Sequence, residues 1–380
     1  MLDTSKRTAF TTEHGLFRDQ LRRFLDREFV PHLARWEKQG MVDREFWLAC
    51  AEAGMLCPGV PEQYRGLGLD FGFNAVLLEE LFYRGCVPSL VVHSDIVPEY
   101  LLHYGSEAQK QLWLPRMVRG EAITAIAMTE PDAGSDLAAI KTRAVRDGDD
   151  YIINGSKTYI TGGQSADLIV LAVKTRPDAG AKGISLMLVE GHREGSVRGP
   201  NLDKIGQKAG DTTELFFNDV RVPASNLLGE EGKGFAQLMN LLSTERLGNA
   251  IIAQASAQRA FDEAVAYTKA RKAFGKTVFD FQNTRFTLAD MAAKLQVGWA
   301  HIDWGIRRHI DKELTSVEAS AAKLFHSEMQ FDICDKALQL HGGAGYMNEY
   351  PIARFWRDAR VSRIYSGTSE IMKEVIGRSL

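Results

Sequence analysis

The spacing of apolar residues changes twice along this chain of 380 residues, and these changes restrict the folds that it can adopt. From Phe17 to about Arg119, apolar residues recur at helical spacing, interrupted by glycine and proline. From about Glu121 to Pro223, short β-rich runs alternate with turns, and after Gly229–Gly234 long helical patterns return. The sequence therefore predicts an α+β fold with a helical domain at residues 1–120, a small antiparallel β domain at 121–230 and a second helical domain at 231–380.

The pattern also places individual elements in the two later domains. The predicted strands are Ala122–Met128, Tyr151–Asn154, Leu168–Val173, Ile184–Val189 and Leu215–Val222. The predicted helices are Phe235–Ala270, Gln282–Asp311 and Ser316–Leu340, with a short final helix from Gly367.

Charge and composition argue against several classes of partner. The formal net charge is −3 and charges of both signs are mixed, so we expect no surface for nucleic acid or for an anionic membrane. No run of 18 apolar residues occurs, and Met1–Phe10 lacks the apolar core of a signal peptide. The four cysteines form no Cys-x-x-Cys pair, which favours a reducing compartment. We expect a cytoplasmic protein, or one of the mitochondrial matrix if a leader has been removed.

Several common catalytic motifs are missing from the sequence. It contains no Gly-x-Gly-x-x-Gly after a strand, no phosphate-binding Gly-x-x-x-x-Gly-Lys-Ser/Thr loop, no His-Glu-x-x-His and no Gly-x-Ser-x-Gly. The histidines also lack metal-ligand spacing, since His301 and His309 are eight residues apart. We therefore predict no metal site and no nicotinamide-binding Rossmann domain.

Two segments of the β domain combine strands with small polar residues. Ala127–Asp136 begins at the end of an apolar strand and turns through small residues, which by itself also fits an ordinary β-turn. Asn154–Gly163 is predicted to be a hairpin, because Asn154-Gly155 is a strong turn signal.

Three further segments interrupt the C-terminal helices. Arg271–Lys276, followed by Gln282, is basic and aromatic, and alone it fits a helix C-cap. Gln339–Met347 and Ile364–Lys373 are glycine-containing breaks that alone need only end or start a helix.

Taken together and in this order, these segments resemble the acyl-CoA dehydrogenase family over essentially the whole chain. The long-chain type is the most similar branch, through His93-Ser94, His341–Gly343 and Glu370–Glu374. The resemblance implies an N-terminal helical domain, a middle β domain and a C-terminal four-helix bundle. It also implies FAD as cofactor, an acyl-CoA substrate and an electron-transfer flavoprotein as partner.

The resemblance further implies which residues contact FAD. Met128 and Thr129 would face the flavin pyrimidine edge, where reduction adds negative charge that fixed donors stabilise. Tyr159 would lie against the ring, where the family commonly has tryptophan, and Thr161 would hydrogen-bond N5. The remaining implied cofactor residues of this part and of the C-terminus are Ile126, Ser135, Gln339, Gly343, Thr368 and Glu370.

The Arg271–Lys276 loop implies an oligomer. In the family this loop reaches the FAD of a neighbouring subunit, so Arg271 would pair with the pyrophosphate. Phe274 and Gln282 would contact the adenosine half. A homo-oligomer follows from this resemblance, a tetramer built as a dimer of dimers.

The catalytic base is implied to lie at Glu245. Much of the family has a glutamate at the position held here by Ser366, and serine cannot remove an α-proton at neutral pH. The long-chain and isovaleryl branches instead use the glutamate before an arginine, which matches Glu245-Arg246. The alternatives are an exposed helical glutamate without catalytic function and a catalytically inactive protein.

The substrate site and its chemistry follow from the same resemblance. The implied substrate contacts are Ser135, Ser243, Arg246, Ser366 and Gly367, with Pro88 and Val92 in the region of the acyl pocket. We predict α,β-dehydrogenation of a medium-to-long or branched acyl-CoA. Two alternatives remain open: a flavin oxidase that uses oxygen, and a non-catalytic protein of the family that binds acyl-CoA or FAD.

Overall fold

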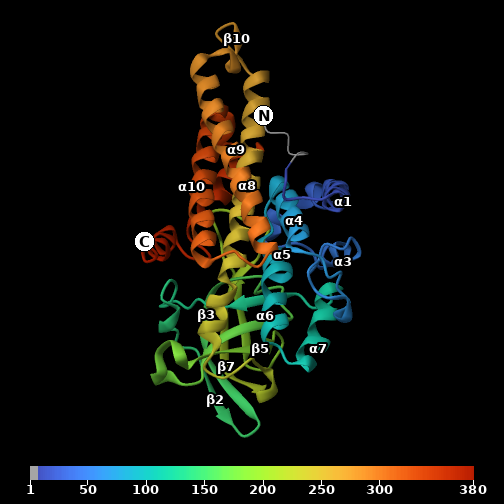
Figure 1. Cartoon of the computed structure of the whole chain (residues 1–380), viewed down its shortest axis with the longest axis vertical. Coiled ribbons are helices and arrows are strands. Elements are labelled where there is room, and N and C mark those ends of the chain that lie inside the picture. The colour runs from blue at the N-terminus through green and yellow to red at the C-terminus, as the bar shows by residue number, and fades with distance from the viewer. Residues whose placement is uncertain (1–6) are drawn as a thin grey trace.

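A computed structural model describes residues 7–380 and shows an elongated molecule (Figure 1). The bundle of long C-terminal helices forms one end, the β-sheet forms the other, and the N-terminal helices lie along one side. The prediction about a signal peptide concerns Met1–Phe10, most of which lies outside the described residues. Within residues 7–380, no helix is both long enough and apolar enough to cross a membrane.

The N-terminal part is helical, as the sequence predicts. Its helices are α1 (Thr12–Glu28), α2 (Leu33–Gln39), α3 (Arg44–Glu52), α4 (Phe71–Arg84), α5 (Pro88–Val91), α6 (Val97–Tyr104) and α7 (Glu107–Val118). A π-helical turn, Val92–Ile96, joins α5 to α6, and such turns are frequent at functional sites. Helix α4 is buried over most of its length and packs against α1 and α8, which explains its nearly continuous apolar sequence.

The β domain is a mixed sheet. Its strands are β1 (Thr124–Ala127), β2 (Arg143–Asp147), β3 (Asp150–Thr161), β4 (Leu168–Lys174), β5 (Ile184–Glu190), β6 (Ser196–Asn201), β7 (Thr212–Pro223) and β8 (Leu227–Leu228). Their order is β6-β7-β3-β2-β4-β5-β8, with β1 beside β4. The pairs β1–β4 and β2–β4 are parallel, so the prediction of an antiparallel sheet was wrong for them. Strand direction depends on the connections between strands, which an alternating apolar pattern does not reveal.

The predicted hairpin at Asn154-Gly155 was also wrong. Strand β3 continues through both residues, and the pairing with β7 shifts between Ile153 and Gly155. A Cβ on Gly155 would approach Thr142 Oγ1 to 2.5 Å, so this glycine permits close packing of strands. The turn lies earlier, where Gly148 has φ 60° between the paired Asp147 and Asp150.

The C-terminal part confirms the predicted helices to within about two residues. It contains α8 (Gly234–Ala270), α9 (Gln282–Ile310), α10 (Ser316–His341), α11 (Pro351–Ala359) and α12 (Ser369–Gly377). Helix α8 packs along α9, α10 and α4, and α11 lies against α8 and α10. A short hairpin of β9 (Lys272–Ala273) and β10 (Lys276–Thr277) joins α8 to α9 at the far end of the bundle (Figure 1).

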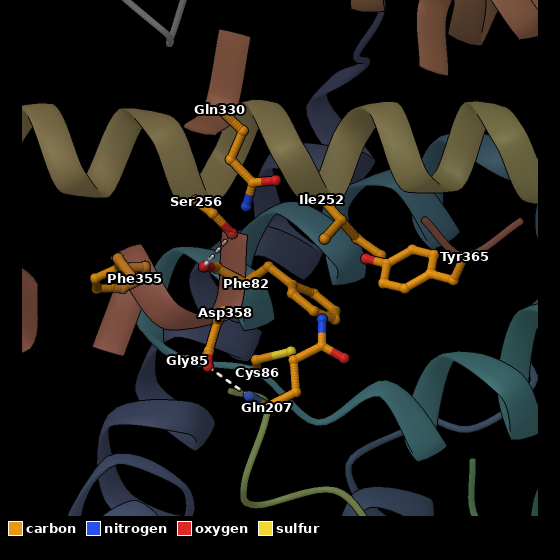
Figure 2. A pocket seen from close by; sticks show the side chains of 10 residues that line it. All are labelled: Phe82, Gly85, Cys86, Gln207, Ile252, Ser256, Gln330, Phe355, Asp358 and Tyr365. Carbon is orange, nitrogen blue, oxygen red and sulfur yellow. Dashed lines mark hydrogen bonds between the residues drawn. The ribbon is translucent and has the colours of Figure 1, made fainter. Parts of the chain in front are cut away.

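A small cavity lies where the N-terminal helices meet the bundle (Figure 2). The Asp358 carboxylate accepts a hydrogen bond from the backbone N–H of Gln207. Burial raises the pKa of Asp358 to about 6. Ser256 Oγ donates to the Phe82 carbonyl at 3.3 Å. The other lining residues are Gly85, Cys86, Ile252, Gln330, Phe355 and Tyr365.

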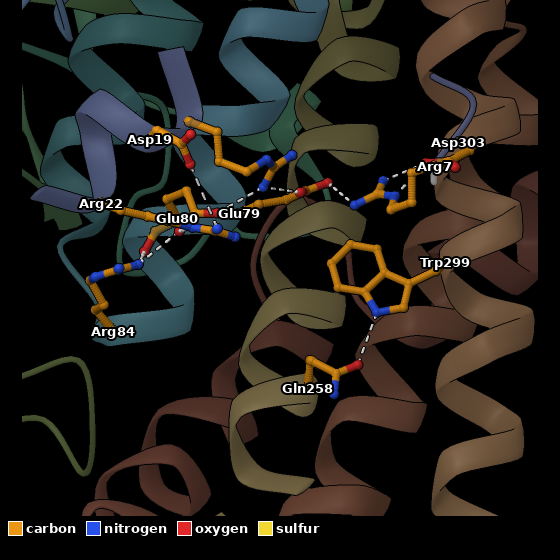
Figure 3. Close-up of polar contacts among 10 residues, drawn as sticks. Arg7, Asp19, Arg22, Glu79, Glu80, Arg84, Gln258, Trp299 and Asp303 are labelled. Carbon is orange, nitrogen blue, oxygen red and sulfur yellow. Dashed lines mark hydrogen bonds and ion pairs between the residues drawn. The ribbon is translucent and has the colours of Figure 1, made fainter. Parts of the chain in front are cut away.

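Buried charges connect the same two parts (Figure 3). The Arg7 guanidinium donates to Glu79 of α4 at 2.6 Å and to Asp303 of α9 at 2.7 Å. Arg18, Arg22 and Arg84 surround the next carboxylate of α4, Glu80. Because buried carboxylates need such partners, this network fixes α4 against the bundle.

Candidate functional site

Glu245 lies in α8 and faces a small cavity between this helix and α6. The cavity is lined by Asp95 and Ile96 of the π-helical turn, Glu99 and Tyr100 of α6, and Leu241, Thr244 and Glu245 of α8. The predicted base is therefore not a solvated surface glutamate. It borders a small space between α6 and α8.

The loop before α12 meets Glu245 directly. The Ser366 hydroxyl donates a hydrogen bond to Glu245 Oε1. Ser366 and Gly367 both have positive φ, 53° and 92°, and Lys323 Nζ of α10 donates to the Gly367 carbonyl at 2.6 Å. The structure thus brings together the predicted base and the loop predicted to bind the thioester, although they are 121 positions apart.

Burial controls the electrostatics of this region. It raises the pKa of Glu245, against the lowering effects of the Ser366 hydrogen bond and of the positive charges of Arg246 and Lys323. Burial, together with the nearby positive charge of Arg246, lowers the pKa of Lys323 to about 8. A carboxyl group with a raised pKa is a stronger base once it is ionised, as removal of a weakly acidic proton requires.

Sequence reasoning missed the polar lining of the cavity. Burial raises the pKa of Asp95 to about 7, and burial also raises the pKa of Glu99. Asp95 Oδ1 accepts a hydrogen bond from Asn74, whereas its buried Oδ2 has no partner within residues 7–380. Both acids interrupt an otherwise largely apolar helical pattern, which was the available signal.

Lys323 was missed as well. It is almost fully buried, at 1% exposure, in a stretch of small residues of α10. Its position lies at helical spacing from the buried Ala319 and His326. A lysine among the buried residues of a helix needs a specific partner, and this was the available signal. The partner is the Gly367 carbonyl.

The other predicted substrate contacts have different surroundings. Arg246 is buried and donates to Ser316 and Ser320 of α10, at 3.1 and 3.0 Å, so it connects two helices. Ser243 is half-buried on α8, and Ser135 is exposed beyond the turn after β1.

Several predicted cofactor residues lie together where the turn after β1 meets the C-terminal part of β3. Lys157 Nζ donates to the Met128 carbonyl at 2.9 Å and to Glu130 at 2.8 Å, and the Thr158 amide donates to the Thr129 carbonyl at 2.9 Å. These bonds hold the Met128–Thr129 turn beside Tyr159. Tyr159 is 70% exposed with φ 58°, and Thr161 is half-buried further along β3. Ile126 lies in β1 itself.

A second group of predicted cofactor residues lies at the opposite end of the bundle. Arg271 and Phe274 belong to the segment joining α8 to α9, Gln282 begins α9, and Phe274 is 94% exposed. Gln339 and Gly343 lie near the same end of the bundle. His341, between them in the sequence, stacks on Tyr267 of α8 with the ring centroids 4.3 Å apart. Within one chain this group lies far from β1 and β3 (Figure 1).

The last two predicted cofactor residues lie at the start of α12. Thr368 caps this helix, since its hydroxyl accepts from the Ile371 amide at 3.3 Å. Glu370 is exposed in the first turn. Within residues 7–380, no group of three or more His, Cys, Asp or Glu side chains could hold a metal ion.

Comparisons with known proteins identify the family. The models of the acyl-CoA dehydrogenase N-terminal, middle and C-terminal domains match residues 11–121, 125–220 and 232–380. The long-chain specific acyl-CoA dehydrogenase of Sus scrofa is 47% identical over 383 residues, covering 100% of this chain and 89% of that protein. This chain belongs to the acyl-CoA dehydrogenase family.

Solved structures of acyl-CoA dehydrogenases agree. The acyl-CoA dehydrogenase of Geobacillus kaustophilus superposes with a TM-score of 0.97 at 50% identity, covering 98% of this chain and 99% of that one. A glutaryl-CoA dehydrogenase of Mycobacterium smegmatis, solved in complex with FADH2, has a TM-score of 0.92 at 28% identity, covering 99% of this chain and 96% of that one. The chain is an oxidoreductase of this family, with FAD as its cofactor.

The residues present fit FAD. Tyr159 leaves an aromatic face exposed beside the Met128–Thr129 turn, as stacking on a flavin ring requires. A Cβ at Gly342 or Gly343 would meet only open space, so a ligand phosphate can approach the backbone there. Exposed Arg271 supplies a guanidinium that suits a diphosphate.

Proposed function

We propose that this acyl-CoA dehydrogenase introduces a trans-2,3 double bond into an acyl-CoA, with Glu245 as the base. The observation that carries the proposal is the meeting of Glu245 with the Ser366-Gly367 loop at the edge of a cavity between helices. An exposed glutamate would have neither the cavity nor a loop suited to hold a thioester. A catalytically inactive protein would lack a base at this point.

The residues divide the reaction between them. The thioester oxygen accepts a hydrogen bond from the Ser366 backbone N–H, which stabilises the enolate charge as it develops. This N–H donates to no other group within residues 7–380. Glu245 then removes the α-proton, and the surrounding helices exclude water from its carboxylate. Bound FAD supplies the acceptor for the β-hydrogen. Ser243, Arg246 and Gly367 line or brace the substrate side.

The cofactor contacts remain those that the family resemblance implies. Ile126, Met128, Thr129, Ser135, Tyr159 and Thr161 form the flavin face of one chain, with Thr368 and Glu370 near the acyl site. We propose that Arg271, Phe274, Gln282, Gln339 and Gly343 serve the FAD of a second copy, because one chain keeps them far from its own flavin face. A homotetramer is the expected assembly.

The proposed substrate is a medium-to-long or branched acyl-CoA. The similarity to the long-chain enzyme of Sus scrofa supports a long acyl chain. An electron-transfer flavoprotein is the proposed electron acceptor, as is usual in the family. An oxidase of the same fold would pass electrons to oxygen instead, so oxygen consumption during turnover distinguishes the two.

The test is an anaerobic titration of the purified holoprotein with palmitoyl-CoA, octanoyl-CoA and isovaleryl-CoA, following the flavin absorbance. We expect one chain class to bleach the wild type and none to bleach Glu245→Gln. Glu263→Gln is the matched control, because it makes the same change on α8 at a glutamate whose ion-pair partner among residues 7–380 is Arg259 alone. If no acyl-CoA bleaches the flavin of the wild type, the proposed dehydrogenation of an acyl-CoA is wrong. If Glu245→Gln is bleached as fast as the control, another base acts.

A further inference from the structure

The Ser366 hydroxyl is the only polar atom of a neighbouring side chain that hydrogen-bonds the Glu245 carboxylate within the described residues. It donates to Oε1, and Oε2 accepts no hydrogen bond from residues 7–380. One oxygen of the proposed base is therefore held, while the other is free to receive a proton. A carboxylate held through one oxygen loses part of its rotational freedom.

The backbone at Ser366 has an unfavourable conformation for serine. Its φ of 53° lies in the left-handed region, which glycine adopts without strain and which other residues adopt at a cost. Gly367 follows with φ 92°, so two consecutive residues turn the chain toward α8. A glycine at position 366 would make this turn more easily but would offer no hydroxyl to Glu245.

Two contacts fix the loop that carries this hydroxyl. Lys323 Nζ, from α10, donates to the Gly367 carbonyl at 2.6 Å. On the other side, Thr368 caps α12 by accepting from the Ile371 amide at 3.3 Å. The hydroxyl therefore comes from a braced loop, and its position relative to α8 is set before any substrate enters.

We propose that Ser366 is a positioning residue for the base: its hydroxyl holds Glu245 Oε1 so that Oε2 points to the substrate α-carbon. The inference rests on the proposed function and adds a side-chain role to the backbone role of Ser366. During the reaction the α-proton passes to Oε2 and the serine keeps its own proton. Lys323 acts one step further away, by holding the loop.

The sign of the expected pH effect follows from the groups around Glu245. A hydrogen bond donated to a carboxylate stabilises the ionised form, so the Ser366 hydroxyl lowers the pKa that burial raises. Removing the hydroxyl should therefore raise the pKa of the base. The charged and titratable groups facing Glu245 are Asp95 of the π-helical turn, Glu99 and Tyr100 of α6, Arg246 of α8, Lys323 of α10 and Tyr365 of the loop.

The experiment isolates proton removal from oxidation. Phenylacetyl-CoA has α-hydrogens but no β-hydrogen, so it cannot be dehydrogenated, and exchange of its α-hydrogens with D2O reports the base alone. We compare the holoenzyme with Ser366→Ala, Ser366→Gly and Glu245→Gln between pH 5 and 9. We expect the midpoint of the acid limb to rise by about 0.5–1 pH unit in both serine variants, which is the net effect of one ordinary hydrogen bond. Below the midpoint, exchange should fall by roughly three- to tenfold.

The glycine variant separates positioning from folding. Ser366→Gly removes the hydroxyl but also the backbone strain, so it should be at least as stable as the wild type while showing the same shift as Ser366→Ala. An unchanged pH profile in a folded Ser366→Gly would overturn the proposal, as would faster exchange, which would mean that the hydroxyl merely occupies the substrate's place. Loss of exchange in Glu245→Gln alone, with both serine variants unchanged, leaves the proposed function standing without this role. Equal exchange by Glu245→Gln and the wild type would overturn both the assignment of Glu245 as the base and the positioning role of Ser366.

Discussion

At the scale of single residues, the site combines buried carboxyl groups whose proton affinities differ from their usual values. Glu245 is the proposed base, and Asp95 lines the same cavity with one oxygen unpartnered among the described residues. Both were polar residues in largely apolar helices, but only Glu245 was singled out, because a family motif marked it. Asp95 has no such motif, and periodicity alone cannot say whether a buried acid faces a cavity or a partner.

Asp95 should make the stability of the protein pH-dependent. Burial raises its pKa from 3.8 to about 7, so its contribution to stability is fully present below pH 3.8 and is lost as the pH rises toward 7. Asp95→Asn keeps an oxygen for Asn74 and removes the ionisation. Between pH 5 and pH 8 the wild type should lose about 2.5 kcal/mol of unfolding free energy relative to this variant, as measured by urea denaturation of the holoprotein. Parallel pH profiles would mean that Asp95 ionises in the folded state without cost.

At the scale of elements, long helices were predictable and details of the sheet were not. The ends of α8, α9 and α10 lie within about two residues of their predicted positions, because caps and breakers mark them. Strands β2 and β6 were missed, since most residues of β2 are exposed and β6 has no fully buried residue. Asn154-Gly155 was misread because a glycine needed for close approach looks the same in sequence as a glycine needed for a turn.

The turn after β1 depends on one buried ion pair of β3. Lys157 is fully buried, burial lowers its pKa to about 8, and it reaches both Glu130 and the Met128 carbonyl. Lys157→Met leaves the Glu130 carboxylate without its cation, and we expect a loss of about 3–5 kcal/mol in unfolding free energy. Weaker retention of FAD should accompany it, because the Met128–Thr129 turn loses its support.

The matched control for this prediction is the double variant Lys157→Met/Glu130→Gln. It removes both charges, so it should recover much of the stability lost in the single variant. Chemical denaturation and the ratio of flavin to protein absorbance are the two measurements. If the double variant is as unstable as the single one, packing of the lysine stem rather than its charge supports the turn.

At the scale of the whole molecule, the N-terminal part is joined to the bundle by charges buried between them. Among residues 7–380, Arg7→Met leaves the buried Asp303 without its cation, while Glu79 keeps Arg18, so we expect about 3–5 kcal/mol of destabilisation, mainly from Asp303. Arg22→Met is the control, because its side chain is 46% exposed and Glu80 keeps Arg18 and Arg84, so this change should cost less than about 1 kcal/mol. Thermal unfolding of the two holoproteins compares them, and equal melting temperatures would show that the Arg7 contacts are not stabilising.

The two groups of predicted cofactor residues lie at opposite ends of one chain, so we expect a complete FAD site to combine residues of two copies. Arg271→Ala and Phe274→Ser change exposed side chains and should leave the stability of the FAD-free protein within about 0.5 kcal/mol. Loss of one charge-assisted contact to a diphosphate should nevertheless weaken FAD binding by about tenfold or more. Fluorescence titration of the FAD-free variants with FAD measures this, with Leu16→Ser as an exposed control on α1.

Mixing Arg271→Ala with a chain altered at the flavin face, Thr161→Val, then shows whether the two residues serve one FAD from different copies. If the two residues serve one FAD from different copies, a mixed dimer has one intact site and one doubly altered site, and about half of its sites bind FAD tightly. If one copy supplies both residues, every site in the mixture remains weakened.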